Sequence, residues 1–426
     1  MRALSLFFFI ILTLSVSGQN SKTLFTKATS PAVAGFSEER IKRIDQTLQS
    51  WIDQKQMNGC VAFISKNGKI VYNKAFGYDN MEKGTPMRTD HIFRIMSQSK
   101  AITSVAIMML FEEGKVLLND PISKFIPEFK NPQVIKSFNL KDTSWVAEPA
   151  KREITIKDLL THTSGLGYAQ IGSAEAKAMY HKYQVPGGIA FHGMVLGDAM
   201  KRLGKLPLFH QPGEKYTYGL NNDVLGYVVE VASGMSFDKF LRTRLFEPLG
   251  MKDTYFYIPK DKQNRLVSAY HQYAEGLTMM PEKMTIVEDV YRDYPNLDGT
   301  YFSGGAGLSS TIYDYALFLQ MLLNGGSYNG KQFLSRATVR MMISNQLEES
   351  VIGADDFGLG FGLTNEKEAS STPLSVGSFE WGGMFATTYW ADPKEGIVAL
   401  IFRNIWPSTF DAATRFKILT YQALAD

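Results

Sequence analysis

The sequence predicts an α/β protein of the α+β type, with an antiparallel β-sheet flanked by helices and built from the N- and C-terminal parts of the chain. Runs rich in β-forming residues lie near both ends, at residues 59–77 and 380–403, whereas the stretch between them shows mainly helical patterns. This order indicates one sheet into which a helical domain is inserted. We therefore predict an α/β subdomain of residues 19–96 and 300–426 and a helical subdomain of residues 97–299.

Residues 1–18 have the pattern of a cleavable secretory signal. Arg2 precedes an apolar run over residues 4–14, and the residues around Ser17 are suited to cleavage. The run is shorter than the ~20 residues that a helix needs to span a bilayer. We expect an exported protein, periplasmic or extracellular, with no stable membrane insertion.

The composition is that of an ordinary globular protein, with 45% hydrophobic and 20% charged residues and a net charge of +3. Positive and negative residues alternate along most segments, which argues against nucleic acid as a partner. The single cysteine, Cys60, excludes an internal disulfide and is expected to be a small buried residue in a strand. The six histidines show no metal-ligand spacing, so we predict no metal.

Two elements are predicted before the first catalytic candidate. Residues 37–54 read as an amphipathic helix because their apolar residues recur every three or four positions. Residues 59–65 and 69–77 read as a β-hairpin because Asn67-Gly68, a strong turn signal, separates two β-rich runs.

The C-terminal part repeats this mixture of helix and strand. Residues 311–324 form a predicted helix that ends at Gly325. Strands are expected near residues 380–391 and 396–403, joined by a hairpin loop, and a final helix over residues 408–425.

Residues 93–110, FRIMSQSKAITSVAIMML, contain the central candidate site. Ser97 and Lys100 stand three residues apart at the start of an apolar run that predicts a buried helix, so both side chains should share one face. A serine hydroxyl needs a base, and a lysine can serve if its amine is neutral. The N–H groups at the helix N-terminus would also favour an oxyanion beside Ser97.

Two other polar residues could be mistaken for catalytic groups. A second Ser-x-x-Lys, at Ser236 and Lys239, follows Gly234 and precedes a helical run, so Ser236 is interpreted as a helix N-cap. His162 suggests a Ser-His-Asp triad, but the sequence contains no Gly-x-Ser-x-Gly, so His162 is interpreted as a structural hydrogen-bonding residue.

Further candidates come from three turns. Tyr218 stands in a turn before an apolar helix and can face a cleft. Gly382 and Gly383 open a predicted strand and let a substrate lie close to the backbone, with the N–H of Met384 directed into the site. The glycine-rich residues 303–307 are interpreted as a turn at the cleft floor, since no Lys-Ser or Lys-Thr follows to make a phosphate site.

The chain resembles the serine β-lactamase and penicillin-binding protein superfamily, specifically its class C and esterase-like (family VIII-type) branch. Five segments carry the resemblance in order, over residues 35–426: GYDNMEKGTPMRTDHIFRIMSQSK, DLLTHTSGL, PGEKYTYGLNNDVLG, GGAGLSST and the strand pair around EWGG. The resemblance implies a β-lactamase/transpeptidase-like fold and acyl-enzyme chemistry with no cofactor.

Carried over by position, the resemblance also implies roles for individual residues. Ser97 would be the acylated nucleophile, Lys100 its proton acceptor and Tyr218 the partner that handles protons at the leaving group. The backbone N–H groups of Ser97 and Met384 would form the oxyanion hole.

Two departures from the family pattern bear on specificity. The family's Tyr-x-Asn ends here in Leu220, with Asn221 one position late, and its Lys-Thr-Gly begins here with Trp381. Both changes resemble the esterase branch, and Arg403 is a candidate to replace the missing lysine. The expected substrate-binding residues are Leu220, Asn221, Trp381, Gly382 and Gly383.

We therefore expect an exported serine hydrolase that cleaves small carboxylic esters or related amides through an acyl-enzyme at Ser97. A β-lactamase, a D-Ala-D-Ala carboxypeptidase or a D-aminopeptidase remains an alternative, as does a penicillin-binding or sensor module that does not turn over. The expected partner is a small ester, β-lactam or peptide-like molecule.

Overall fold

The computed structural model describes residues 24–169, 171–189, 193–284, 290–353 and 355–425. The signal predicted at residues 1–18 lies outside these residues. None of the helices within them is both long and apolar enough to cross a membrane.

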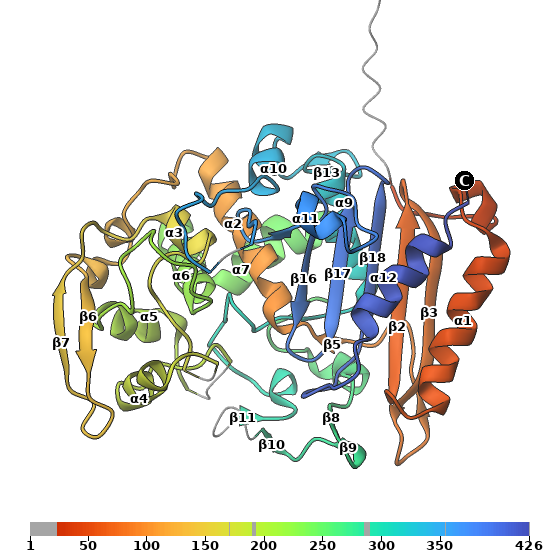
Figure 1. The fold of residues 1–426 in the computed structure, drawn as a ribbon, viewed down its shortest axis with the longest axis horizontal. Helices are drawn as coiled ribbons and strands as arrows, with labels where there is room; N and C mark the ends of the chain where they lie inside the picture. Colours follow the sequence, from red (N-terminus) through yellow and green to blue (C-terminus); the bar gives the residue numbers. More distant parts are fainter. Residues whose placement is uncertain (1–23, 170, 190–192, 285–289, 354, 426) are drawn as a thin grey trace, which may run out of the picture.

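The central sheet is built from both ends of the chain, as predicted (Figure 1). Its strands run in the order β1 (Thr26–Lys27), β3 (Lys69–Asn80), β2 (Gly59–Lys66), β18 (Ile397–Phe402), β17 (Thr387–Asp392), β16 (Phe379–Gly383) and β15 (Gly362–Leu363), and β4 (Thr85–Pro86) pairs with β3. All pairs are antiparallel except β1 with β3. The predicted α/β class is therefore confirmed.

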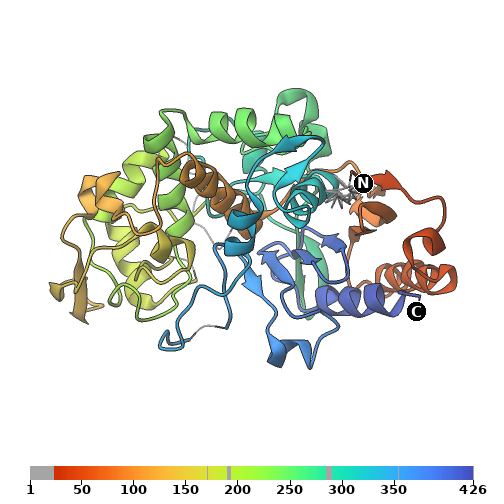
Figure 2. The same ribbon diagram turned by 90° about the horizontal axis from the view of Figure 1, so that it is seen from above.

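Helices cover both faces of this sheet (Figures 1 and 2). α1 (Glu38–Asp53) and α12 (Ala412–Gln422) lie side by side on the outer face, and α2 (Ser99–Glu112) and α9 (Ile312–Leu323) lie on the inner face. Alternation along the strands explains the two cores, because successive side chains point to opposite faces. In β2, Val61 and Phe63 join the inner core, whereas Cys60 packs toward α1.

The N-terminal predictions agree closely with the structure. Ser37 caps α1 by accepting a hydrogen bond from the Arg40 N–H, and the β2–β3 turn places Asn67 and Gly68 at positive φ, as a tight hairpin turn requires. Cys60 is buried and unpaired, and burial raises the pKa of its thiol to about 12.

The segment between α2 and α9 contains both helices and small hairpins. The helices are α3 (Ile156–Leu160), α4 (Ala174–Lys182), α5 (Leu196–Gly204), α6 (Asn221–Ser233), α7 (Phe237–Leu241) and α8 (Glu247–Leu249). The hairpins pair β6 (Gln133–Phe138) with β7 (Trp145–Pro149), β8 (Tyr270–Tyr273) with β9 (Gly276–Met279) and β10 (Lys283–Met284) with β11 (Val290–Tyr291). The helical patterns alone did not reveal these hairpins, whose strands have few residues with which to show a period of two.

Shorter elements complete the fold. They are β5 (Phe93–Arg94) paired with β12 (Ser309–Ser310), β13 (Ser327–Tyr328) paired with β14 (Lys331–Gln332), α10 (Arg336–Met342) and α11 (Glu366–Ala369). Single turns of tighter or wider helix are η1 (Pro31–Ala34), η2 (Met96–Gln98), η3 (Ile122–Lys124), η4 (Pro127–Phe129), η5 (Arg242–Phe246), η6 (Lys260–Arg265) and η7 (Tyr294–Asn296).

The strand predicted at residues 380–391 is in fact two strands. β16 and β17 are separated by a tight turn over residues 384–386, in which Ala386 takes a φ of 61° and its N–H bonds to the Gly383 carbonyl. The apolar pattern of residues 380–391 continues through the turn because Phe385 is buried there. The sequence pattern therefore does not reveal that the chain reverses direction.

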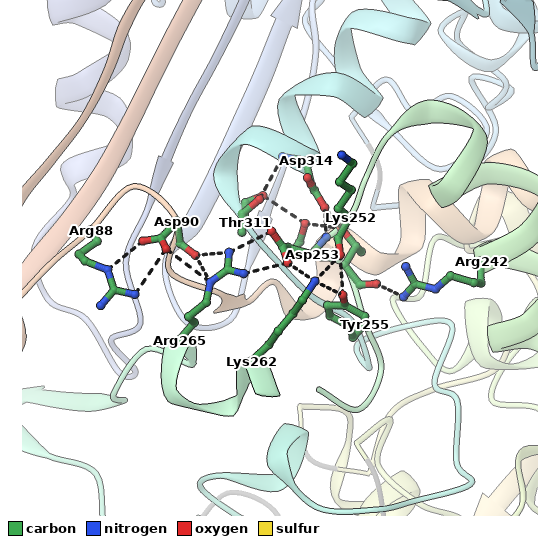
Figure 3. Close-up of polar contacts among 12 residues, drawn as sticks. Arg88, Asp90, Arg242, Lys252, Asp253, Tyr255, Lys262, Arg265, Thr311 and Asp314 are labelled. Carbon is green, nitrogen blue, oxygen red and sulfur yellow. Dashed lines mark hydrogen bonds and ion pairs between the residues drawn. The ribbon is translucent and has the colours of Figure 1, made fainter. Parts of the chain in front are cut away.

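A polar cluster anchors the start of α9 to the segment before η6 (Figure 3). Asp253 accepts hydrogen bonds from Arg265 and Lys262, and its own N–H bonds to Asp314 at 2.7 Å. Thr254 also donates to Asp314, whose carboxyl is buried, and burial raises its pKa to about 6. The cluster joins the helical segment to the inner layer of the sheet.

Arg94 joins the two parts of the chain from within. Its guanidinium is fully buried and donates to the carbonyls of Val267 and Arg292, to the side chain of Asn404 and to the carboxylate of Asp293. It thereby ties β5 to the segment after β18 and to the loop after β11.

Candidate active site

Ser97 lies in the single turn η2, two residues before α2 begins at Ser99. The preceding residue, Met96, has a φ of 47°, a left-handed conformation that is strained for a side chain of this kind. Met96 and Gln98 are buried, whereas Ser97 is partly exposed. This turn presents the hydroxyl of Ser97 at the surface of a cavity.

Lys100 lies one helical turn further and points back at Ser97, as the three-residue spacing predicts. Its Nζ lies 3.3 Å from Ser97 Oγ, 3.1 Å from Tyr168 Oη and 2.7 Å from the Gly305 carbonyl oxygen. Lys100 is 3% exposed, so these three contacts take the place of water around its amine.

The glycine-rich turn of residues 303–307 supports Lys100 from below. A Cβ on Gly305 would lie 2.5 Å from Asp223 Oδ2 and 2.9 Å from Tyr168 Oη, so only glycine fits at this position. The close approach brings the Gly305 carbonyl to Lys100. The turn therefore contacts Lys100, although none of its residues lines the cavity at Ser97.

Tyr218 meets Lys100 through the face of its ring. The Lys100 Nζ lies 4.5 Å from the ring centroid, a cation–π geometry, and Tyr218 lines the cavity together with Ser97. The Trp381 ring lies 5.8 Å from that of Tyr218. The structure thus brings three of the predicted residues, Ser97, Lys100 and Tyr218, into one place.

His162 has the structural surroundings that the sequence suggested. It is buried, its Nδ1 is 2.8 Å from Asn221 Nδ2, and its ring lies 4.8 Å from that of Tyr218. Burial lowers the pKa of His162 well below its ordinary value, and the nearby Lys100 charge adds to that shift. The imidazole is therefore neutral and supports the ring of Tyr218.

Tyr168 is a site residue that the sequence analysis missed. It follows the THTSGLG segment, is 5% exposed and touches Lys100 directly, although 68 residues separate the two. The only available sequence signal was its position three residues after the glycine of THTSG, which does not distinguish a site tyrosine from a core tyrosine.

A cavity of about 630 Å³ opens at Ser97. Three of the expected substrate-binding residues line it, namely Trp381, Gly382 and Gly383. Its remaining lining residues come mainly from the segments around β15, β16 and α11: Tyr216, Tyr218, Gly353, Asp355, Asp356, Phe357, Gly362, Leu363, Glu368, Glu380, Thr388 and Lys417.

The other two expected substrate-binding residues do not reach this cavity. Leu220 is fully buried in the hydrophobic core, and Asn221 is also fully buried, with its side chain bonded to His162 and Ser164. Because Leu220 begins the turn into α6, the helix carries both side chains inward. Asn221 therefore supports His162, and the expected contact of either residue with substrate is corrected.

Arg403 does not replace the missing lysine of the family pattern. Its guanidinium is buried and donates to the Phe410 carbonyl and to Ser408, and it lies near Cys60 on the outer side of the sheet. The cation is therefore directed away from Ser97.

The end of β16 packs against the chain just before the nucleophile. A Cβ on Gly383 would collide with the Ile95 carbonyl, so the glycine permits this close approach. Met384 follows at once and packs with Met96 and Phe385. Met384 is not among the described residues that line the cavity, and the oxyanion-hole role of its N–H stays a prediction.

One wall of the cavity is acidic. Asp355, Asp356, Glu368 and Glu380 line it, and Lys417 is the one cation among the described residues of the lining. Lys417 is already ion-paired with Glu380. Burial raises the pKa of Glu368, and the neighbouring carboxylates raise it further. The wall therefore presents net negative charge to a bound molecule.

Within the described part of the chain, no three His, Cys, Asp or Glu side chains gather closely enough to hold a metal ion.

The chain matches a family model and is similar in sequence to several known proteins. A family model described as Beta-lactamase matches residues 42–423. The Mycobacterium tuberculosis protein Rv1367c is 33% identical over 378 residues, covering 85% of this chain and 89% of that protein. Esterase EstB of Burkholderia gladioli is 27% identical over 376 residues, covering 85% of this chain and 90% of the esterase.

A solved structure shares the whole fold. EstCE1, described as a hydrolase with promiscuous acyltransferase activity, superposes with a TM-score of 0.75 at 26% identity, covering 91% of this chain and 98% of its own.

Proposed function

Because the chain belongs to the Beta-lactamase family and is a serine hydrolase, we propose that it hydrolyses small carboxylic esters, or related amides, through an acyl-enzyme at Ser97. The observation that carries this proposal is the contact between Ser97 Oγ and Lys100 Nζ at the mouth of a cavity. A hydroxyl activated by an adjacent amine is suited to attack a carbonyl carbon.

In the proposed acylation step, Ser97 Oγ bonds to the ester carbonyl carbon while its proton passes to Lys100 Nζ. The N–H groups of Ser97 and Met384 stabilise the resulting oxyanion. The C–O bond to the alcohol then breaks, and the proton that Lys100 took from Ser97 passes by way of Tyr218, whose ring contacts Lys100, to the departing oxygen.

Deacylation reverses these roles with water as the nucleophile. Water bonds to the acyl carbon and loses a proton to the same Lys100 and Tyr218 pair, and the bond between the acyl group and Ser97 Oγ breaks. The carboxylic acid leaves and Ser97 recovers its proton.

The cavity favours esters over β-lactams for two reasons. Trp381, which stands where the β-lactam-processing relatives carry a lysine, lines the cavity and offers an apolar face with one neutral donor. A penicillin carboxylate would also need a positively charged partner, whereas four carboxylates line one wall of the cavity. A charge-assisted hydrogen bond contributes roughly 1.5 to 3 kcal/mol, so its loss weakens binding of such substrates.

A panel of substrates tests the proposal directly. On the purified protein, we expect kcat/KM for p-nitrophenyl acetate or butyrate to exceed that for nitrocefin or penicillins at least ~10²-fold. A D-Ala-D-Ala peptide tested in the same series measures the peptidase alternative. Hydrolysis of nitrocefin at the rate of the short esters would favour a β-lactamase, and stoichiometric acylation without release would favour a penicillin-binding module.

We also propose that the protein is exported, on the basis of residues 1–18. Expression of the full chain with a C-terminal tag should give a shortened protein outside the cytoplasm. N-terminal sequencing should place its first residue close to Gln19. An intact Met1 in the cytoplasmic fraction would contradict export.

A further inference from the structure

Asp223 is a buried carboxylate directly behind the catalytic lysine. It lies in the first turn of α6, is fully buried and accepts hydrogen bonds at Oδ1 from Ser303 at 2.6 Å and Tyr301 at 3.4 Å. Its Oδ2 has no side-chain hydrogen-bond partner among the described residues, and the nearby Gly305 N–H is the backbone donor that acts on the carboxylate and, against the larger effect of burial, lowers its pKa. Burial of a carboxylate oxygen without a side-chain donor is unfavourable for folding, so stability does not explain the presence of Asp223 at this position.

Asp223 Oδ2 and the hydroxyl of Tyr168 lie near the same side of Gly305, although no hydrogen bond joins them in this structure. A Cβ built on Gly305 would lie 2.5 Å from Asp223 Oδ2 and 2.9 Å from Tyr168 Oη. Burial raises the pKa of Tyr168 well above its ordinary value, and the Asp223 charge raises it further. Tyr168 therefore keeps its proton, and Asp223 is the acceptor toward which that proton can point.

The direction of this proton matters because Lys100 has three neighbours. In the neutral form that Lys100 must take to act as a base, its amine has two N–H donors and one lone pair. The Gly305 carbonyl can only accept, so it takes one N–H. If Tyr168 Oη accepts the second, the lone pair remains for the proton of Ser97. If Tyr168 instead donates its proton to Lys100, it occupies the lone pair that Ser97 needs.

We propose that Asp223 is a positioning residue that holds the Tyr168 hydroxyl as an acceptor toward Lys100 and so keeps the amine lone pair directed at Ser97. The proposal rests on the proposed function only in taking Lys100 as the base for Ser97. Asp223 itself does not line the cavity and contacts no substrate.

The state of Asp223 should then be visible in the pH profile. Burial raises the pKa of Asp223 to about 6, against the opposing effects of the Ser303 hydrogen bond and the Lys100 charge. The titratable groups that face it are Lys100 from α2, Tyr168 from the segment after α3 and Tyr301 from the segment before β12. Protonation of Asp223 removes the acceptor, so the acylation rate should fall as the pH drops through about 6.

The test measures the rate of labelling of Ser97 by a fluorophosphonate, which reports acylation whatever the natural substrate. For Asp223→Asn we expect this rate to fall at least about 30-fold, within the range for proton-handling groups, and to show no inflection near pH 6. For an ester that the enzyme hydrolyses, the KM of Asp223→Asn should stay within about threefold of wild type, because the substitution should lower kcat only.

A double-mutant cycle separates positioning from general structural damage. Tyr168→Phe should slow labelling by a similar factor, and the double variant Asp223→Asn/Tyr168→Phe should be little slower than either single variant, because both remove the same link. Matched controls are Asp314→Asn, another buried carboxyl whose pKa burial raises to about 6, and Tyr180→Phe, a buried tyrosine that accepts a bond from the Gly167 N–H. Both controls should label at the wild-type rate.

Two results would overturn the proposal: a labelling rate within about threefold of wild type for folded Asp223→Asn, or losses that multiply in the double variant. If Asp223→Asn does not fold, the pH profile of labelling for Tyr168→Phe tests the proposal instead. Loss of the inflection near pH 6 in this profile supports the proposal, and its retention overturns the proposal. Failure of the proposed function looks different, because a wild-type protein that labels at Ser97 but cleaves no ester leaves this test unaffected.

Discussion

At the scale of single residues, two tyrosines approach Lys100 in different ways. Tyr218 lines the cavity and presents its ring to Lys100, whereas Tyr168 is buried behind Lys100 and bonds to its amine. Under the proposed mechanism, Tyr218 would meet the leaving group and Tyr168 would orient Lys100. Ser97 is held in front of both by the strained turn at Met96.

The first prediction concerns the nucleophile. A fluorophosphonate should add once, at Ser97, because among the serines that the structure describes only Ser97 is both partly exposed and in contact with Lys100. Ser97→Ala should abolish labelling and turnover, as measured by intact-protein and peptide mass spectrometry. Ser236→Ala is the matched control, since Ser236 precedes α7 as its N-cap residue, and it should label normally. Label on Ser99, Ser164 or Ser236 would refute the assignment.

A second prediction concerns proton transfer at the front of the site. Lys100→Ala and Tyr218→Phe should each lower kcat/KM for a short ester at least ~10²-fold, the usual range for general acid–base groups. The control is Tyr227→Phe, a partly exposed position later on α6. Steady-state kinetics over pH check it. Near-normal activity of folded Tyr218→Phe would mean that another group, with Tyr168 the nearest candidate, carries the proton.

At the scale of elements, β16 shapes the cavity by combining a large side chain with two glycines. Trp381 packs on Tyr218 and on Phe357, while Gly383 lets the strand end press against the residue before Met96. The strand therefore supplies both an apolar wall and the close backbone approach that an oxyanion hole needs.

The third prediction follows from Trp381. Replacing it by lysine should narrow the ratio of kcat/KM values for p-nitrophenyl butyrate and nitrocefin by about tenfold, because a charge-assisted bond to a substrate carboxylate becomes available. Trp381→Phe keeps the apolar face without the charge and should leave the ratio close to that of wild type. A ratio unchanged by lysine would show that the acidic wall outweighs the added cation.

The fourth prediction concerns that wall. A choline-type cationic ester should be preferred over a monoester bearing a free carboxylate, and Glu368→Gln should reduce this preference by about two- to fivefold, the effect of one partly screened charge pair. The preference should weaken in high salt. Glu366→Gln, on the same short helix but outside the cavity lining, is the matched control. Equal rates for both esters would argue that the wall does not contact the substrate.

At the scale of the whole molecule, buried polar links hold the two ends of the chain and the inserted segment together. The sheet itself joins β2 and β3 to β18, and Arg94 adds a fully buried connection to Asn404 and to the loop near Asp293. Site residues come from both parts, so the cavity depends on this assembly.

The fifth prediction concerns Arg94. Arg94→Met should lower the free energy of unfolding by about 3 kcal/mol or more, because it leaves buried carbonyls and Asn404 without their donor. Urea unfolding followed by tryptophan fluorescence measures the change. Arg88→Met, which removes a half-exposed arginine paired with Asp90, should change stability by less than about 1 kcal/mol. Equal losses for the two variants would show that the buried network is not a main source of stability.

The sequence by itself determined the features that depend on local spacing. The period of the helix predicts that Ser97 and Lys100 meet, and the Asn67-Gly68 turn predicts the first hairpin, because both follow from neighbours in the chain. The order of strand-rich and helix-rich segments was enough to predict one sheet made from both ends of the chain. These predictions are confirmed.

Only the tertiary structure decided which distant residues meet. Tyr168 reaches Lys100 across 68 positions, and Asp223 reaches Ser303 across 80, and no local period encodes such contacts. The same holds for Leu220 and Asn221, whose inward direction depends on how α6 packs. A side chain's role depends on what packs around it, and long-range packing is set by the whole fold.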